Sequence, residues 1–507
     1  ADGSGSAPIT HSIDDVLDFR IAGKGDTIVF KTQPGLRDGM AAIEREGLRG
    51  FHYDDRFSPM TRSRPFVPAP AEIGFLVQSL SNAGGVRSAT LADKVEFDNG
   101  AGFADGVIVG APSGMAAWMT FKDGTFPPAP TLHVRLRDGR IVTCPQTPCD
   151  RHVSDIWWTS RGTLRFLRRE GWGNEETAIY EWAPTKGAPR RLFATRDVLS
   201  SCQGVDEGLI CLREASTKPR YVARIALPSG RGTILYDPNP EFSRLSLGRV
   251  ERLHWKNKEG LEVFGDLVFP IGYQAGQRYP LIVVQYESRG FLRGGTGDEY
   301  PIQLFAKNGY AVISFNRPPD IGLFKGTRTL AEAERANLKD FADRRSVQSA
   351  LEASIALLVK RGIVDPERAG ITGASSVQFA LLNSRLFRAA AMSSGFWDSS
   401  LAMRVGPGSM RDFAAMGYPG ALSEADSFWD TISIAKHAGN FRTPMLLQLA
   451  DTEYLGALTA FTALRQAKAP VDMYVFPQET HIKWQPSHRL AIYSRSLAWF
   501  DFWRRGM

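Results

Sequence analysis

The chain has 507 residues, of which 43% are hydrophobic, 11% aromatic and 23% charged, and its formal net charge is +7. This length exceeds what one hydrophobic core usually serves, so an ordinary globular composition predicts two large domains. The positive charge is spread without a basic block, and no apolar run is long enough to cross a bilayer, which argues against nucleic-acid binding and membrane insertion.

Residues 1–24 are predicted to form an N-terminal arm. The stretch from Ala1 to Pro8 consists of small residues, as in a mature secreted chain after signal removal or in a cloning remnant. In residues 9–20, acidic residues follow Ser12, a pattern typical of an N-capped amphipathic helix.

Residues 25–245 contain short β-type runs that are broken by Gly, Pro, Asn and Asp. Residues 164–168 resemble residues 209–213, and residues 178–184 resemble residues 222–228, which gives a repeat of about 45 residues. A repeat of this length in an all-β region predicts the blades of a β-propeller, about five at this spacing. Two similar hairpins of a β-sandwich remain the alternative.

The four cysteines form two close pairs, Cys144 with Cys149 and Cys202 with Cys211. The second pair flanks a turn-rich segment, so a disulfide across a hairpin would fit, and no histidine completes a zinc site. Two disulfides would indicate an oxidising compartment, for which the periplasm is our expectation, whereas four free thiols would fit the cytoplasm.

Residues 246–507 change to apolar strands that alternate with helices. Strands are expected at residues 280–286, 311–315, 368–372, 389–393, 444–450 and 471–476, and helices at 346–360, 379–387, 455–468 and 486–503. Such alternation predicts an α/β-hydrolase domain, a mostly parallel sheet with helices on both faces. Reactive groups are expected at the carboxyl ends of its strands.

The motif Gly373-Ala374-Ser375 joins a predicted strand to a predicted helix. A serine at the tip of such a turn projects from the sheet as a nucleophile, and the nearby helix N-terminus can stabilise an oxyanion. The alternative is an N-capped helix after a Gly turn. Val377 and Gln378 stand where related hydrolases carry glycines, so Ser376 stays a second candidate for the nucleophile.

A serine nucleophile needs a base and an acid, which follow it in the chain in the hydrolase order. Among the later histidines, His481 lies in a loop before the last helix, whereas His437 reads as a helix C-terminal cation and His488 as surface. Asp451 and Glu453 both follow the strand at residues 444–450. The register of related hydrolases favours Glu453, with Asp451 holding the turn.

The oxyanion of an acyl-transfer reaction needs hydrogen-bond donors. The backbone N–H of Ser376 is one by its position after Ser375. Tyr286, at the end of the strand at residues 280–286, can supply its phenol as the second donor. The alternative for Tyr286 is an aromatic side chain that packs on the sheet.

A propeller followed by a hydrolase with Tyr286, Ser375, an acid near residue 453 and His481 resembles the prolyl oligopeptidase family of serine peptidases. Residues 449–457 and 481–489 resemble the lasso peptide isopeptidases within it. The resemblance implies a Ser-His-Glu triad of Ser375, His481 and Glu453, seven blades, and no cofactor or metal.

The function that this resemblance implies is hydrolysis of the isopeptide bond between the N-terminal amine and an Asp or Glu side chain of a threaded lasso peptide. One alternative is an ordinary peptidase of linear peptides, and another is an inactive peptide-binding module. The substrate cleft is expected between the domains. The polar cluster Asp54, Asp55 and Arg56 can line it or form a solvated loop.

Overall fold

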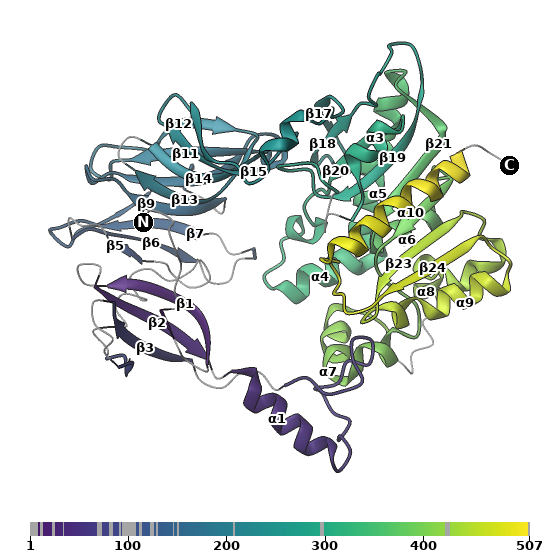
Figure 1. Ribbon diagram of the computed structural model, residues 1–507, viewed down its shortest axis with the longest axis horizontal. Coiled ribbons are helices and arrows are strands. Elements are labelled where there is room, and N and C mark those ends of the chain that lie inside the picture. The colour runs from purple at the N-terminus through teal and green to yellow at the C-terminus, as the bar shows by residue number, and fades with distance from the viewer. Residues whose placement is uncertain are drawn as a thin grey trace.

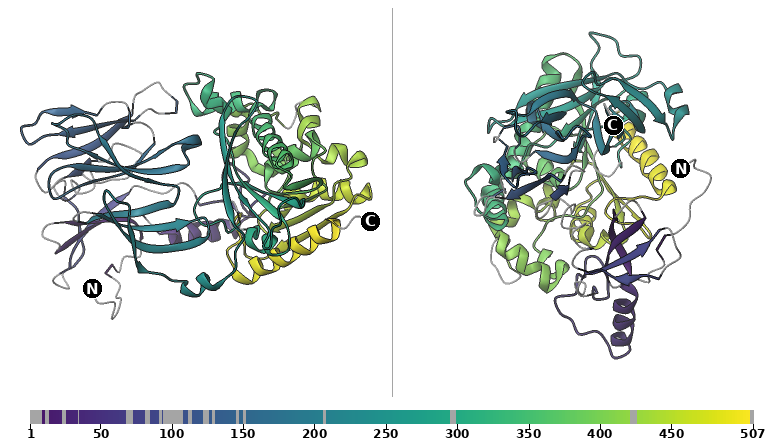
Figure 2. Two further views of the ribbon diagram at one scale, coloured as in Figure 1. Left: turned by 90° about the horizontal axis from the view of Figure 1, so that it is seen from above. Right: turned by 90° about the vertical axis from the view of Figure 1, so that its left-hand side faces the viewer.

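The computed structural model describes residues 9–10, 14–22, 26–33, 35–67, 73–80, 85–90, 93, 108–110, 114–121, 126–127, 130–144, 147–149, 152–205, 208–294, 299–420 and 426–504. An all-β part and an α/β part lie side by side in Figure 1 and in the left view of Figure 2. The first part is drawn in purple to blue, and the second in teal, green and yellow.

The N-terminal part contains four four-stranded antiparallel sheets within the described ranges. The first holds β1 (Asp15–Ala22), β2 (Thr27–Gln33), β3 (Gly74–Ser79) and β4 (Arg87–Ser88), and the second β5 (Ile108–Gly110), β6 (Ala116–Phe121), β7 (Pro130–Arg135) and β8 (Ile141–Thr143). The third holds β9 (Val153–Trp158), β10 (Leu164–Glu170), β11 (Glu176–Trp182) and β12 (Arg190–Thr195). The fourth holds β13 (Val198–Val205), β14 (Gly208–Ala215), β15 (Lys218–Ala226) and β16 (Gly232–Tyr236).

These sheets are the blades of a propeller. The first strands of consecutive sheets lie together, because β9 contacts both β5 and β13. The predicted repeat is confirmed, since its two copies occupy the second and third strands of the third and fourth sheets. Phe166 packs with residues of the second sheet and Leu167 with residues of the fourth, so β10 buries both its faces. The third sheet is therefore a blade packed between two neighbouring blades.

The estimate of five blades is wrong for the described chain, which contains four. The connection between β2 and β3 is much longer than a hairpin turn and includes α1 (Leu36–Gly47), so residues counted as blade strands lie outside the sheets. Both predicted cysteine pairs are disulfides, and Cys202–Cys211 joins the neighbouring strands β13 and β14.

The predicted helix over residues 9–20 is also wrong. Residues 15–22 form β1, which pairs antiparallel with β2, and the proposed cap Ser12 lies outside the described residues. Strand β2 carries the buried side chains Ile28, Val29 and Phe30. Pairing with this strand outweighs a local helix preference, which is worth only a fraction of a kcal/mol per residue.

The long β2–β3 connection reaches the second domain. After α1 the chain runs to α7 (Leu401–Met416), as Figure 1 shows. There Met60 N donates to Arg404 O at 2.7 Å, and Asp55 pairs with Arg411 at 2.6 Å. The cluster predicted at Asp54 to Arg56 therefore contacts α7, and Arg56 itself is held by Asp54 and Glu46.

The C-terminal domain is built on one eight-stranded sheet, in the order β17-β18-β20-β19-β21-β22-β23-β24, with parallel pairing from β20 to β24. Its strands are β17 (Val250–Lys256), β18 (Glu262–Val268), β19 (Tyr279–Tyr286), β20 (Ala311–Asn316), β21 (Val364–Gly373), β22 (Ala389–Met392), β23 (Met445–Ala450) and β24 (Val471–Phe476). Its remaining helices are α3 (Ile302–Lys307), α4 (Leu330–Leu338), α5 (Ala342–Lys360), α6 (Ser375–Asn383), α8 (Asp426–Ile432), α9 (Leu458–Gln466) and α10 (Pro486–Arg504).

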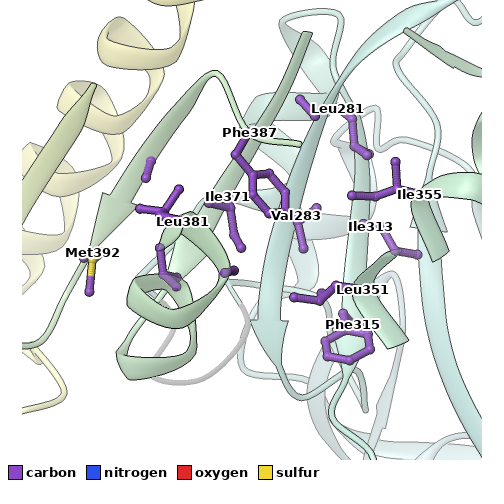
Figure 3. Close-up of a cluster of buried hydrophobic side chains, with 14 of the residues drawn as sticks. Leu281, Val283, Ile313, Phe315, Leu351, Ile355, Ile371, Leu381, Phe387 and Met392 are labelled. Carbon is purple, nitrogen blue, oxygen red and sulfur yellow. The ribbon is translucent and has the colours of Figure 1, made fainter. Parts of the chain in front are cut away.

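Helices cover both faces of this sheet, as predicted. Leu281 and Val283 of β19 pack with residues of α5, α6 and α9, whereas Ile282 and Val284 pack with residues of α3 and α10. Figure 3 shows the first of these cores. Its labelled side chains are Leu281, Val283, Ile313, Phe315, Leu351, Ile355, Ile371, Leu381, Phe387 and Met392. Burial of both faces explains why the strands are continuous apolar runs.

The two domains meet through a buried glutamate. Glu175, between β10 and β11, accepts hydrogen bonds from Arg252 at 2.8 Å and pairs with His254 at 2.9 Å, both on β17. Arg252 also pairs with Asp266 of β18. The charges of Glu175, Arg252 and Asp266 are thereby paired. Within the described residues, no helix is long and apolar enough to cross a membrane.

Candidate active site

Ser375 lies where β21 ends and α6 begins, so the predicted strand–turn–helix is present. Gly373 makes the turn with a φ of +139°, a region that favours glycine. A Cβ atom there would lie 3.3 Å from the Val377 side chain, so the turn is closely packed. Ser375 is the first residue of α6, which places the helix N-terminal N–H groups beside it.

Val377 and Gln378, which replace the expected glycines, are both buried. Val377 joins the core of the sheet. The Gln378 side-chain amide donates to Trp397 O at 2.7 Å and accepts from Trp397 N at 2.9 Å. These bonds tie the first turn of α6 to the loop after β22.

Tyr286 and Ser376 come together as the sequence predicted. The Tyr286 hydroxyl, at the end of β19, accepts from Ser376 N at 3.1 Å and from Ala374 N at 3.0 Å. The phenol oxygen therefore lies against the N–H groups that flank Ser375. A hydroxyl in this position can turn its own proton toward an oxyanion.

His481 and Glu453 also meet. His481 Nδ1 lies 2.7 Å from Glu453 Oε1, and this hydrogen bond raises the pKa of His481 above its ordinary value. Burial and the nearby Lys483 cation act in the opposite direction on this pKa. Asp451, the other candidate acid, accepts from Gln478 N at 2.7 Å. It holds the turn between two loops, as expected.

The other two late histidines are bound elsewhere. His437 lies in the short 3-10 helix Ala435–Asn440 and bonds to Asp430 O. His488 Nδ1 lies 2.7 Å from Oε1 of the buried Glu479, so the prediction that His488 is a plain surface residue is wrong. Glu479 also accepts from Trp484 N and Gln485 N, which fixes the loop before α10.

In the described chain no hydrogen bond joins Ser375 to His481. Such contacts are often long before a substrate binds. The Ser375 turn and the Glu453–His481 pair nevertheless follow β21, β23 and β24, which run parallel in one sheet. The carboxyl ends of these strands share one edge, where reactive groups of α/β sheets lie.

Sequence reasoning missed a buried ion pair beneath His481. Lys483 is 0% exposed and its Nζ lies 3.1 Å from Glu299 Oε1. The same amine donates to Ser393 O at 2.8 Å and to His481 O at 3.1 Å. No local pattern marks Lys483, because its burial depends on a partner 184 residues away.

The prolyl oligopeptidase family matches residues 299–505. The lasso peptide isopeptidase AtxE2 of Asticcacaulis excentricus is 38% identical over 515 residues, which cover 99% of this chain and 72% of that protein. The chain belongs to the lasso peptide isopeptidases of the prolyl oligopeptidase family. It is therefore a serine hydrolase that acts on amide bonds, and the inactive binding module is no longer needed as an interpretation.

Solved structures agree with this assignment. A serine-to-alanine variant of the AtxE2 isopeptidase with Astexin3-dC4 bound has a TM-score of 0.89 at 36% identity, covering 100% of this chain and 78% of that chain. Pyrococcus horikoshii acylaminoacyl peptidase shares the fold, with a TM-score of 0.57 at 19% identity over 95% of this chain and 70% of its own.

A cavity of about 190 Å³ lies beside the serine turn of this isopeptidase-family chain. Its lining includes Ser375, Ser376, Arg344, Asp343 and Tyr418, all from the hydrolase domain. Arg344 donates to Ser375 O at 3.2 Å, and burial raises the pKa of the Asp343 carboxyl. The walls of this cavity are polar, which suits an amide-containing substrate better than an apolar side chain.

Proposed function

We propose that Ser375, His481 and Glu453 hydrolyse the isopeptide bond that joins the N-terminal amine of a lasso peptide to its Asp or Glu side chain. The observation that carries the proposal is the pairing of His481 Nδ1 with Glu453 Oε1 on the sheet edge that also presents Ser375. The 38% identity to a lasso peptide isopeptidase supports the substrate class.

In the proposed first step, Ser375 Oγ attacks the carbonyl carbon of the side-chain amide, and His481 Nε2 takes the serine proton. Glu453 accepts from Nδ1–H, which keeps the imidazole in the tautomer that leaves Nε2 free as a base. The tetrahedral intermediate then collapses. His481 gives its proton to the departing N-terminal amine, and an ester of Ser375 remains.

In the second step, water attacks the ester carbonyl while His481 takes one proton from it. The carboxylic acid of the Asp or Glu side chain is released and the Ser375 hydroxyl is restored. The ring is opened, so the products are a free N-terminal amine and a free side-chain carboxylate.

The oxyanion of both intermediates is proposed to lie between Ser376 N–H and the Tyr286 hydroxyl. Without substrate, the Tyr286 oxygen itself accepts from Ser376 N at 3.1 Å. A substrate carbonyl oxygen that enters this position would take over the Ser376 N–H bond and accept a hydrogen bond from the phenol O–H. The backbone N–H of Ser376 is fixed in the first turn of α6, and donors held in this way stabilise developing charge.

The deciding experiment is mass spectrometry of a threaded lasso peptide and of its unthreaded isomer with the same sequence and ring. Each is incubated with the wild-type protein and with Ser375→Ala. We expect a gain of one water on the threaded peptide alone, lost in the variant. Hydrolysis of backbone bonds would instead indicate an ordinary peptidase of linear peptides. A Ser375→Ala protein with normal turnover would move the nucleophile to Ser376.

We also propose that the protein works in an oxidising compartment such as the periplasm. The two disulfides support this, because cytosolic thiols are normally kept reduced. Fractionation of the producing cells, followed by detection of the protein, tests the proposal. Recovery with cytoplasmic markers would overturn it.

A further inference from the structure

A second cavity, of about 210 Å³, lies between the two domains. It is lined by charged side chains from the propeller and from the loop that follows β19. These are Arg169, Glu214, Arg220, Glu287, Arg289 and Arg293. Four arginines therefore face two glutamates.

Two of these arginines already share one ion-pair partner. Glu214 pairs with Arg220 at 2.6 Å and with Arg293 at 3.1 Å, and it also accepts from Phe291 N. Glu214 is itself buried, so it serves as the local counter-ion for that side of the cavity. It has no further capacity to compensate the remaining cations.

Arg289 and Arg169 make no side-chain hydrogen bond or ion pair within the described part of the chain. Arg289 is half-buried against the Phe264 ring, 5.0 Å from its centroid. Burial, followed by the neighbouring Arg169 charge, lowers the pKa of Arg289 to about 10. Arg289 therefore remains charged at neutral pH, although its surroundings disfavour that charge.

The other charges near Arg289 offset this effect only in part, because Glu287 and Glu175 favour the charged form while Arg252 opposes it. Arg252 is a third cation, but it is paired with Glu175 and Asp266. Glu287 is the remaining anion, and its exposed carboxylate bonds to no cation in the described residues. A partly buried cation of this kind is stabilised when an anion binds beside it.

The cavity is close to the reacting groups. Arg289 follows Tyr286 by three residues, which limits the separation of their Cα atoms to about 11 Å. The Tyr286 hydroxyl in turn lies 3.1 Å from Ser376 N. A peptide held at Ser375 can therefore reach Arg289 within a few residues of the bond that is cut.

We propose that this interdomain cavity is a carboxylate-binding subsite, in which Arg289 and Arg169 hold a carboxylate of the bound peptide. The inference rests on the proposed function, because it assumes a peptide at Ser375. Guanidinium groups bind carboxylates through paired hydrogen bonds, which gives both affinity and orientation. The carboxylate can be the C-terminal one of the peptide or an Asp or Glu side chain of its loop or tail.

The test measures peptide binding to the inactive Ser375→Ala protein by calorimetry, and kcat and KM in the active protein. Arg289→Gln should weaken binding about 10- to 100-fold, as expected for a lost charge-assisted bond, with kcat changed little. The affinity of the Arg289→Lys protein for the peptide should lie between those of the parent protein and Arg289→Gln. Arg224→Gln, an exposed arginine of β15 outside the cavity, is the control for net charge and should bind like the parent protein.

Glu287→Gln provides a test of opposite sign. Removal of this anion should strengthen binding of the peptide carboxylate, because Glu287 competes for the same arginines. Tighter binding by Glu287→Gln together with weaker binding by Arg289→Gln supports the subsite. Weaker binding by both variants would contradict it.

The peptide is then varied to find the source of the carboxylate. A C-terminally amidated peptide and peptides with single Asp→Asn or Glu→Gln changes are compared on parent and Arg289→Gln protein. The partner of Arg289 is the carboxylate whose neutralisation weakens parent binding but leaves the variant unaffected. If every neutralised peptide loses as much affinity for the Arg289→Gln protein as for the parent protein, no carboxylate is bound by Arg289 and the subsite is wrong.

The outcomes separate the two proposals. If wild-type protein opens no lasso peptide, the proposed function fails before the subsite is tested by turnover. If wild-type protein opens the lasso peptide, and Arg289→Gln labels normally with a fluorophosphonate probe, the subsite can be judged separately. Binding and cleavage of the peptide by Arg289→Gln at wild-type levels would then refute only the subsite.

Discussion

Lys483 Nζ lies 3.1 Å from Glu299 Oε1, and neither side chain is more than 3% exposed. The pair connects the segment before α3 with the loop that carries His481, and a hydrogen bond from Nζ to Ser393 O adds the end of β22. His481 is itself 57% exposed, so the rigidity of its backbone comes from the residues beneath it. Lys483 is in this sense a positioning residue.

Lys483→Met should destabilise the fold by about 3–5 kcal/mol, because it leaves Glu299 buried and unpaired. The double variant with Glu299→Gln removes that charge and should recover part of the stability. Both variants should show reduced kcat, since His481 O loses its bond to Nζ. Urea unfolding and steady-state kinetics measure these effects. A double variant with wild-type kcat would show that the pair serves only folding.

Variants of Lys483 and Glu299 should also change the pH dependence of kcat/KM. The Lys483 cation lowers the pKa of His481 and the Glu299 carboxylate raises it. His481 acts as a base only when neutral, so kcat/KM rises with pH through its pKa. Lys483→Met should move this acid limb to higher pH, and Glu299→Gln should move it to lower pH. An acid limb that stays in place would rule out an electrostatic effect of the pair.

Glu453→Gln should affect His481 more strongly. The hydrogen bond from Nδ1 to Glu453 is the largest cause of the raised pKa, so its loss should lower that pKa and shift the acid limb to lower pH. The rate should fall by about 10⁴-fold, as when the acid of a comparable triad becomes an amide. Asp451→Asn is the control. It should leave the pH profile unchanged, because Asp451 accepts from Gln478 N and not from His481.

Tyr286→Phe removes the hydroxyl that lies 3.1 Å from Ser376 N. If this group stabilises the oxyanion, kcat should fall by about 10²–10³-fold with little change in KM. Circular dichroism and fluorophosphonate labelling should show that the fold and the nucleophile are retained. A rate within twofold of wild type would assign Tyr286 to packing.

The contact between the β2–β3 connection and α7 can be tested with Gly406 inside α7 and Gly417 at its C-cap, which differ in how closely this connection approaches them. Gly406 and Gly417 both have positive φ, +83° and +101°. A Cβ at Gly406 would lie 1.9 Å from Phe57 O, whereas at Gly417 its nearest neighbour is 3.7 Å away. Gly417→Ala should cost about 1–2 kcal/mol for the backbone alone. Gly406→Ala should cost at least about 1–3 kcal/mol more, through the clash with Phe57 and through a ψ of 169° that at positive φ favours glycine.

Equal unfolding free energies for the two variants would mean that the connection is not seated on α7. Asp55→Asn, which breaks the exposed pair with Arg411, should change the unfolding free energy little. The backbone packing, and not this ion pair, is expected to hold the two domains together at that point.

Elements whose signals are local could be predicted from the chain alone. The Gly373–Ser375 turn, the continuous apolar strands and the repeat that begins at Leu164 and Leu209 each follow from neighbouring residues. The acid and base were predictable because Glu453 and His481 follow strands whose carboxyl ends share one edge. The choice of Glu453 over Asp451, which follows the same strand, came from the register of related hydrolases.

Tertiary structure alone decided the rest. Residues 15–22 have a helix-like pattern, yet they pair with β2. Backbone pairing with a strand that is part of a sheet is more stable than a short isolated helix in water. Lys483 and Glu299 are 184 residues apart, and Arg169 and Arg289 approach only where two domains meet. Burial and charge compensation are properties of the three-dimensional surroundings, so no spacing along the chain could reveal which of these side chains is paired and which is left with an uncompensated charge.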